Sequence, residues 1–231
     1  MRLDPNLVAS LPRSISNARL SPYMARYKGD QTYAIRLYAW NIEVSAAFWG
    51  PLCMLEIALR NSMHDTMANG RIPKWWEIQT VHLADRSEKL LKLALEKLEK
   101  NGNLSPTADD IVAATSLGFW VGLLDVGVAR HSLLDYETAL WRPRLNKAFP
   151  NRGALERKQV HSKLDRIRKF RNRIAHHEPI FGAGLLEMHN LIIECIGLVD
   201  EGVAIYVKES QRVDRVIEGQ QSAVSMGTCS F

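Results

Sequence analysis

"LDRIRKFRNRIAHHEPIF", residues 164–181, contains the pattern that decides the fold. At about 100° per residue, four apolar side chains fall on one side of a helix: Leu164, Ile167, Phe170 and Ile174. A helix packs its apolar side against other elements, so we expect this side to face the core of a helical bundle. Pro179 disfavours helical geometry at the residue before it. The helix, expected over residues 154–177, should therefore end near His177.

The rest of the chain repeats the helical pattern. Apolar residues recur at helical spacing, whereas the alternating runs of Val, Ile and Thr that mark strands do not occur. We therefore predict an all-α protein. Besides residues 154–177, the expected helices cover 32–47, 50–68, 85–100, 105–124, 136–147 and 184–199, with a short helical tail after them.

Prolines and small polar residues mark the two ends of the chain. Residues 1–22 contain three prolines and are expected to form an N-terminal arm with one short helix. Residues 23–210 are expected to form the helical domain. Residues 211–231 are expected to form a C-terminal tail that is partly disordered, because the tail ends in small and polar residues.

The composition is that of a soluble globular protein. Of the 231 residues, 46% are hydrophobic and 24% are charged, so the chain can bury a core without disulfides. The three cysteines lie far apart, which favours a reducing compartment, and Cys53 and Cys195 occur in apolar runs where burial is expected. We find no signal peptide and no uncharged apolar run of about 20 residues, so we expect a cytoplasmic protein without membrane contact.

Positive charge gathers on the expected helix 154–177. Asp165 is the only acidic residue between Arg157 and Arg173. A basic stripe on one helix is typical of proteins that contact phosphate groups, so we expect RNA to bind there. The alternative is a solvated surface that keeps the protein soluble. The residues expected to bind RNA are Lys163, Arg166, Arg168, Lys169 and Arg173.

Arg171 and His176 have the chemistry that RNA cleavage requires. The guanidinium offers a planar fork of donors that matches a phosphate, and an imidazole gives and takes protons near neutral pH. Together they are sufficient for cleavage without a metal, and the need for a 2′-OH selects RNA as the substrate. The two residues are five positions apart, about 140° around the helix axis, so the Arg171 side chain must extend around the helix to approach His176.

Other chemistries have little support in the sequence. His176, His177 and Glu178 are candidate metal ligands, but adjacent residues on a helix point about 100° apart and rarely bind one ion. No further cluster completes the set, and neither a GxSxG elbow nor a GxxxxGK phosphate loop occurs. We therefore expect no metal and no cofactor.

Two segments carry a family resemblance. The spacing of Arg171, Asn172 and His176 resembles the Arg-x4-6-His motif of the HEPN superfamily. Residues 37–67, which include a Leu-Glu-x-x-Leu-Arg-Asn run, and FRNRIAHHEPIF at residues 170–181 resemble the Abi-like branch (abortive infection, AbiD/AbiF-type) of that superfamily. SLGFWVGLL, residues 116–124, also fits this branch.

The resemblance implies a fold and a function. It implies a HEPN-like helical bundle with additional N-terminal and C-terminal helices. It also implies a homodimer that brings two copies of the motif into one cleft. The implied activity is a metal-independent endoribonuclease that leaves a 2′,3′-cyclic phosphate, acting as a toxin in phage defence, with an antitoxin, protein or RNA, as a further partner.

The resemblance also assigns roles to residues. Arg171 and His176 correspond to the catalytic pair, and Asn172 to a residue that orients it. Supporting motif positions are His177, Glu178, Glu56, Arg60 and Asn61. Some HEPN toxins have a tyrosine at the position of Glu178, and a partner enzyme modifies it. Control of activity by this modification is therefore not expected here.

Several alternatives stay open. The same helix would grip RNA without cutting it if the protein is a binding module of a defence or toxin–antitoxin system. A structural bundle with a solvated basic face is a third reading. Glu56 and Arg60 have the spacing of an ordinary intrahelical ion pair, as an alternative to RNA contact. His64 is expected at the surface.

Overall fold

The fold is described by a computed structural model that covers residues 4–182 and 184–230. Within these residues the ordered elements are helices, and the β-type pairing is a single isolated bridge between Gly127 and Asp135. The prediction of an all-α protein is therefore confirmed.

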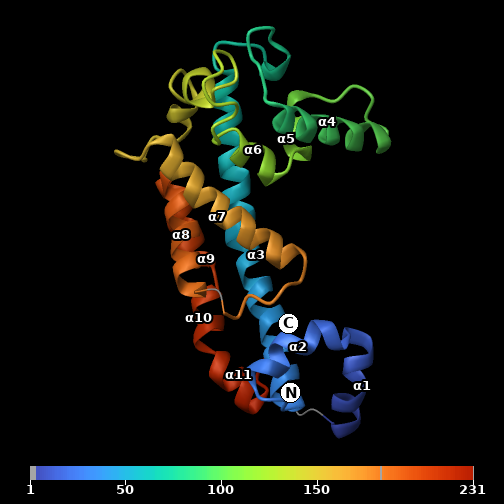
Figure 1. The fold of residues 1–231 in the computed structure, drawn as a ribbon. Coiled ribbons are helices and arrows are strands. Elements are labelled where there is room, and N and C mark those ends of the chain that lie inside the picture. Colours follow the sequence, from blue (N-terminus) through green and yellow to red (C-terminus); the bar gives the residue numbers. More distant parts are fainter. Residues whose placement is uncertain (1–3, 183, 231) are drawn as a thin grey trace. The chain divides into compact units, whose positions relative to one another are not determined.

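Fourteen helical segments follow one another along the described residues (Figure 1). They are α1 (Pro5–Ile15), α2 (Asn17–Arg26), α3 (Gln31–Ala68), η1 (Trp75–Glu77), α4 (Asp85–Lys100), α5 (Ala108–Ala114), α6 (Leu117–Gly122), η2 (Glu137–Trp141), η3 (Leu145–Ala148), α7 (Arg157–Ala175), α8 (Leu185–Val199), α9 (Glu201–Ser210), α10 (Val213–Glu218) and α11 (Gln220–Met226).

The chain forms two compact units. The terminal unit contains residues 1–52, 170–190 and 209–231, and the central unit contains residues 53–169 and 191–208. This division differs from the expected arm, domain and tail, because both ends of the chain belong to the same unit as the end of α7. Helices α3, α7, α8 and α9 each supply residues to both units.

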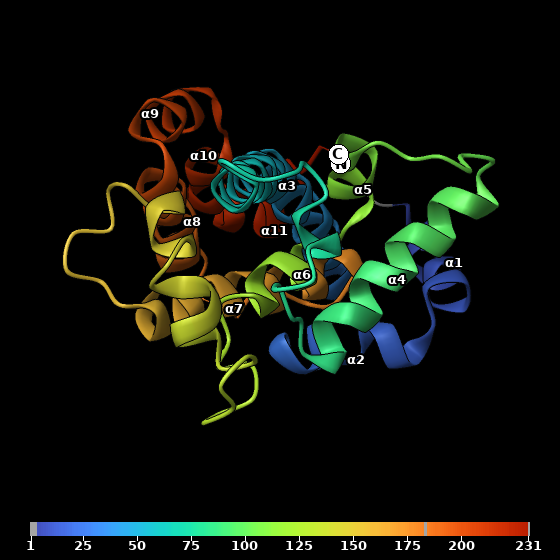
Figure 2. The same cartoon turned by 90° about the horizontal axis from the view of Figure 1, so that it is seen from above.

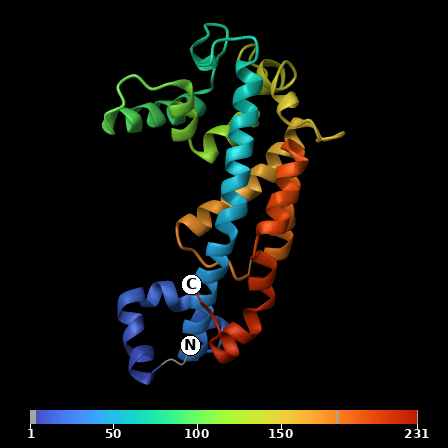
Figure 3. The ribbon, with the colours of Figure 1, turned by 180° about the vertical axis from the view of Figure 1, so that it is seen from behind.

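In the terminal unit, the C-terminal segment packs against the first turns of α3 (Figure 3). The Trp40 indole donates a hydrogen bond of 2.9 Å to the carbonyl of Val216 in α10, and Arg36 donates one of 2.7 Å to the carbonyl of Ser225 in α11. The expectation of a partly disordered tail is therefore corrected. Its small apolar residues, such as Val224, are buried against partners that lie far away in the sequence.

The arm expected at residues 1–22 is also more ordered than predicted. It forms most of two helices, α1 and α2, and each contains a proline. Ser16 explains the boundary between them, because its hydroxyl accepts a hydrogen bond from the Arg19 amide and caps the start of α2.

Helix α3 is one helix where two were expected. Pro51 lies inside it and is buried, as are Phe48 and Leu52 beside it. Proline removes one backbone hydrogen bond, but the packing of its neighbours holds the helix together, so the expected break near Gly50 does not occur. By length and composition α3 is long and apolar enough to cross a membrane, a property that core helices of soluble proteins and signal sequences share.

In the central unit, α4 lies beside α5 and α6 (Figure 2). The expected helix 105–124 is divided here, because Thr115 and Ser116 adopt extended backbone. Thr107 caps the start of α5, in a capping box with Asp110. The expected helix 136–147 is a π turn and a 3-10 turn, interrupted around Pro143.

Burial confirms the predicted core side of α7. Leu164, Ile167, Phe170 and Ile174 are all buried. Cys195 is buried as expected, whereas Cys53 is exposed and that expectation was wrong. A position in an apolar run need not face the core, because the direction of a helix side chain depends on its angle around the axis.

Candidate functional site

The predicted motif lies at the C-terminal end of α7, in the terminal unit. His176 is still in helical contact, since its amide donates to the carbonyl of Asn172 (2.9 Å). The His177 amide donates to Ile174 (2.9 Å) and the Glu178 amide to Arg173 (2.8 Å), which is the hydrogen-bond pattern of a Schellman motif. The helix therefore ends where the sequence predicted, within two residues.

His177 occupies the left-handed position of this motif. Its φ angle is 56°, in a region that glycine adopts without strain and that most other residues avoid. The backbone turns sharply at His177, so His176 is the last side chain that α7 presents. Both imidazoles are exposed.

Three side chains hold the turn that follows. Arg19 of α2 donates a hydrogen bond of 2.7 Å from Nη1 to the carbonyl of His177. Arg173 bonds to the carbonyl of Pro179, and its Nε lies 3.6 Å from Oε2 of Glu178. Asn41 of α3, only 4% exposed, accepts the Ile180 amide at Oδ1 (2.8 Å). The backbone after the histidines is thus fixed from both sides.

Arg171 is half-buried and contacts a tryptophan that the sequence did not single out. The Cζ atom of Arg171 lies 5.6 Å from the ring centroid of Trp49, a cation–π geometry. Trp49 is 40% exposed, although it sits in the apolar helix α3. An exposed aromatic ring beside the motif arginine is therefore a further candidate for contact with a substrate.

Several of the predicted RNA-binding cations are engaged in ion pairs. Asp165 pairs with Arg168 (2.6 Å) and with Lys169 (2.8 Å), and Lys163 pairs with Glu194 (2.9 Å). Arg166 is exposed. Burial opposes ionisation of Asp165, but hydrogen bonds from Lys169 and Arg168 outweigh it and lower the pKa of that carboxyl. The stripe is therefore partly neutralised, which the linear count of charges did not reveal.

The three supporting residues of α3 belong to the central unit. Glu56 and Arg60 are half-buried, and Asn61 is exposed. Arg60 makes a long hydrogen bond of 3.5 Å to the carbonyl of Ala113. With Asn61 it lines a pocket of about 410 Å³ that also contains Asp65. This setting favours the structural reading of Arg60 over RNA contact.

No family model matches the chain, and no curated protein or solved structure matches it either. The site is therefore interpreted from its own geometry. Among the residues that the structure describes, no three His, Cys, Asp or Glu side chains are grouped so as to hold a metal ion.

Two buried histidines were not foreseen. His64, expected at the surface, is buried and accepts a hydrogen bond of 3.2 Å at Nδ1 from the Trp75 indole. His189 is 3% exposed, and its Nδ1 lies 3.0 Å from Oδ1 of Asp214. Both partners lie at a distance in the sequence, so helical periodicity gave no signal for either pair. Each pair lies within one unit and has a structural role there.

Proposed function

We propose that this protein is a metal-independent endoribonuclease of the HEPN type, in its Abi-like branch. The observation that carries the proposal is the end of α7. His176 is exposed at a backbone-fixed helix end, and Arg171 precedes it on the same helix. In this assignment Arg171 holds the scissile phosphate, His176 moves protons and Asn172 orients the pair.

The reaction follows from these groups. The 2′-oxygen of one nucleotide attacks the adjacent phosphorus, and the bond from phosphorus to the 5′-oxygen breaks. One imidazole takes the proton of the 2′-OH, and a second proton reaches the leaving 5′-oxygen. The products are a 2′,3′-cyclic phosphate and a 5′-hydroxyl. In the proposed homodimer, the second copy of the motif supplies the second imidazole.

The biological role that accompanies this activity is a proposal of the same standing. The protein would act in the cytoplasm as an abortive-infection toxin in phage defence, and an antitoxin of protein or RNA would hold it inactive. The basic residues of α7 support RNA binding: Arg166 and Lys169 are exposed, whereas Lys163, Arg168 and Arg173 are less exposed and each lies beside an acidic side chain.

The test is cleavage of mixed-sequence RNA in the presence of a chelator, with analysis of the product ends. We expect cyclic-phosphate ends, and a loss of about 10²–10⁴-fold on His176→Ala, the usual contribution of a general acid or base. Arg171→Ala should also abolish cleavage. His161→Ala, on the same helix but away from the motif, is the matched control. Circular dichroism verifies the fold of each variant, and sedimentation tests the dimer.

Two outcomes would overturn the proposal. One is cleavage that survives both motif changes, and the other is cleavage that the chelator stops.

RNA binding without cleavage is the second candidate function, and Trp49 favours it. An exposed aromatic ring beside an arginine is a combination with which proteins hold single-stranded RNA whether or not they cut it. Intact RNA after long incubation near neutral pH would select this candidate.

A further inference from the structure

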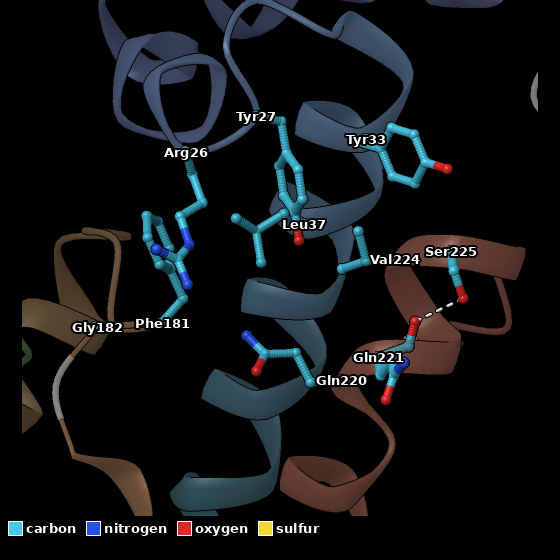
Figure 4. Close-up of a pocket in the computed structure, with 10 residues that line it drawn as sticks. All are labelled: Arg26, Tyr27, Tyr33, Leu37, Phe181, Gly182, Gln220, Gln221, Val224 and Ser225. Carbon is cyan, nitrogen blue, oxygen red and sulfur yellow. Dashed lines mark hydrogen bonds between the residues drawn. The ribbon is translucent and has the colours of Figure 1, made fainter.

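A pocket of about 530 Å³ lies in the terminal unit, among the end of α2, the first turns of α3, the segment after the motif turn and α11 (Figure 4). Its volume is within the range of sites that bind small organic ligands. The residues that carry the argument are Arg26, Tyr27, Tyr33, Phe181, Gln220 and Gln221.

Aromatic rings form two of its walls. Tyr27 and Tyr33 are stacked, with ring centroids 5.5 Å apart and planes inclined by 26°. Phe181 lies across the pocket from Tyr33 and is held by the buried ring of Tyr23, whose centroid is 5.1 Å from its own. The rings are thus fixed at the edges of an open space, where a planar ligand can stack on them.

A cationic side chain and neutral polar groups line the rest. Arg26 is exposed at the rim, and no residue that lines the pocket is acidic. Within the described part of the chain, no carboxylate lies within ion-pairing distance of Arg26. Gln220 and Gln221 of α11 bring side-chain amides, each of which both donates and accepts hydrogen bonds. The pocket therefore offers an anion site and an amide edge beside aromatic faces.

A nucleotide combines these three requirements, since it has a planar ring, a hydrogen-bonding edge and a phosphate. We propose that this pocket binds one nucleotide, with the base on the aromatic walls, its edge toward the amides and its phosphate at Arg26. The inference rests on the proposed function only in taking an RNA strand as the source of that nucleotide. A free mononucleotide has the same chemistry.

The path of the chain connects the pocket to the motif. Helix α2 carries Arg19, which bonds to the carbonyl of His177, and seven residues later Arg26, about 10 Å further along the helix. Phe181 follows His176 by five residues. In this proposal, a strand with its scissile phosphate at the motif extends to the pocket, which reads a base near the cut.

Calorimetric titration of the intact protein tests the inference. The ligands are the four 5′-mononucleotides and short single-stranded oligoribonucleotides, the latter added to the His176→Ala variant so that they stay intact. We expect Arg26→Gln to weaken binding by about tenfold or more, through loss of a charge-assisted hydrogen bond. Tyr33→Leu, which removes the ring but keeps apolar bulk, should weaken it by about fivefold or more. Arg13→Gln in α1 is the matched control, and melting curves verify folding.

The outcomes separate the possibilities. If mononucleotides bind and both variants weaken them, the pocket accepts a free nucleotide; if only oligoribonucleotides respond, it reads a strand. Absence of binding, or binding that neither variant changes, overturns the inference. Variant-sensitive binding to a protein that never cleaves RNA would leave the pocket in place and refute the nuclease. RNA cleavage by a protein whose nucleotide binding neither variant changes would support the nuclease and overturn the proposal for the pocket.

Discussion

The guanidinium of Arg171 lies over the indole ring of Trp49, with Cζ 5.6 Å from the ring centroid. This contact joins the predicted motif on α7 to the apolar helix α3 within the terminal unit. It limits the directions in which the long arginine side chain can point. The ring therefore positions the group that is proposed to hold the phosphate.

Replacement of Trp49 should affect both stability and cleavage. Trp49→Leu is expected to reduce the free energy of unfolding by about 0.5–1 kcal/mol, the contribution of an exposed cation–π contact. It should lower kcat/KM for RNA by about two- to fivefold, while Trp49→Phe keeps a face for Arg171 and should lose less. Urea denaturation and steady-state kinetics measure the two effects. Equal behaviour of the Leu and Phe variants would contradict this role of the ring.

His177→Gly should stabilise the protein. Glycine adopts the left-handed conformation of this position without strain, and the gain is expected to be about 1 kcal/mol in the free energy of unfolding. The same change at His176, which directly follows α7 and still donates its amide to the carbonyl of Asn172, should destabilise it by about the same amount. Thermal denaturation of the two variants compares neighbouring positions in one experiment. A loss of stability in His177→Gly would show that its side chain has a role beyond the turn.

Asn41→Ala should loosen the segment after the motif. The buried Ile180 amide would lose its acceptor, and an unpaired buried donor costs about 1–3 kcal/mol of unfolding free energy. Hydrogen exchange should accelerate at the Ile180 amide in particular. Ser45→Ala, one helical turn along α3, removes only a local hydroxyl bond and serves as the control. Unchanged exchange at Ile180 would contradict this assignment.

We expect the stability of the protein to depend on the ionisation of Asp165 at acidic pH. Because its pKa is lowered in the folded protein, the ionised carboxyl stabilises the fold at pH values above its usual range. This contribution is lost as the pH falls through the lowered pKa. Asp165→Asn should therefore flatten the acid side of the stability profile, whereas Glu99→Gln at an exposed position should not. Denaturation curves at a series of acidic pH values make the comparison.

The same substitution should strengthen RNA binding. Asp165→Asn releases Arg168 and Lys169 from their ion pairs, which leaves both cations available to phosphate groups. The slope of log affinity against log salt concentration is expected to increase by about one to two units, since each added phosphate contact contributes about one. Binding to the cleavage-deficient His176→Ala background measures the slope. An unchanged slope would place the bound RNA away from this part of α7.

Local pattern alone predicted a large part of the structure. The all-α class, the buried side of α7 and the end of that helix near His177 all follow from spacing and from Pro179, because helical periodicity and the steric effect of proline act over a few residues. The motif itself is local in the same way, which is why its residues could be proposed from the sequence.

The tertiary structure decided what depends on distant partners. The C-terminal segment is held on α3 because Trp40 and Arg36 donate hydrogen bonds to its carbonyls, and buried His189 lies beside Asp214. Trp49 contacts Arg171 although about half of the chain length separates them in the sequence. Such pairs have no local signature, since their free energy appears only when packing brings the two segments together. The sequence by itself therefore determined the helical class, the buried side of α7 and the position of the motif, and the packing between segments determined where several helices begin and end and what surrounds the motif.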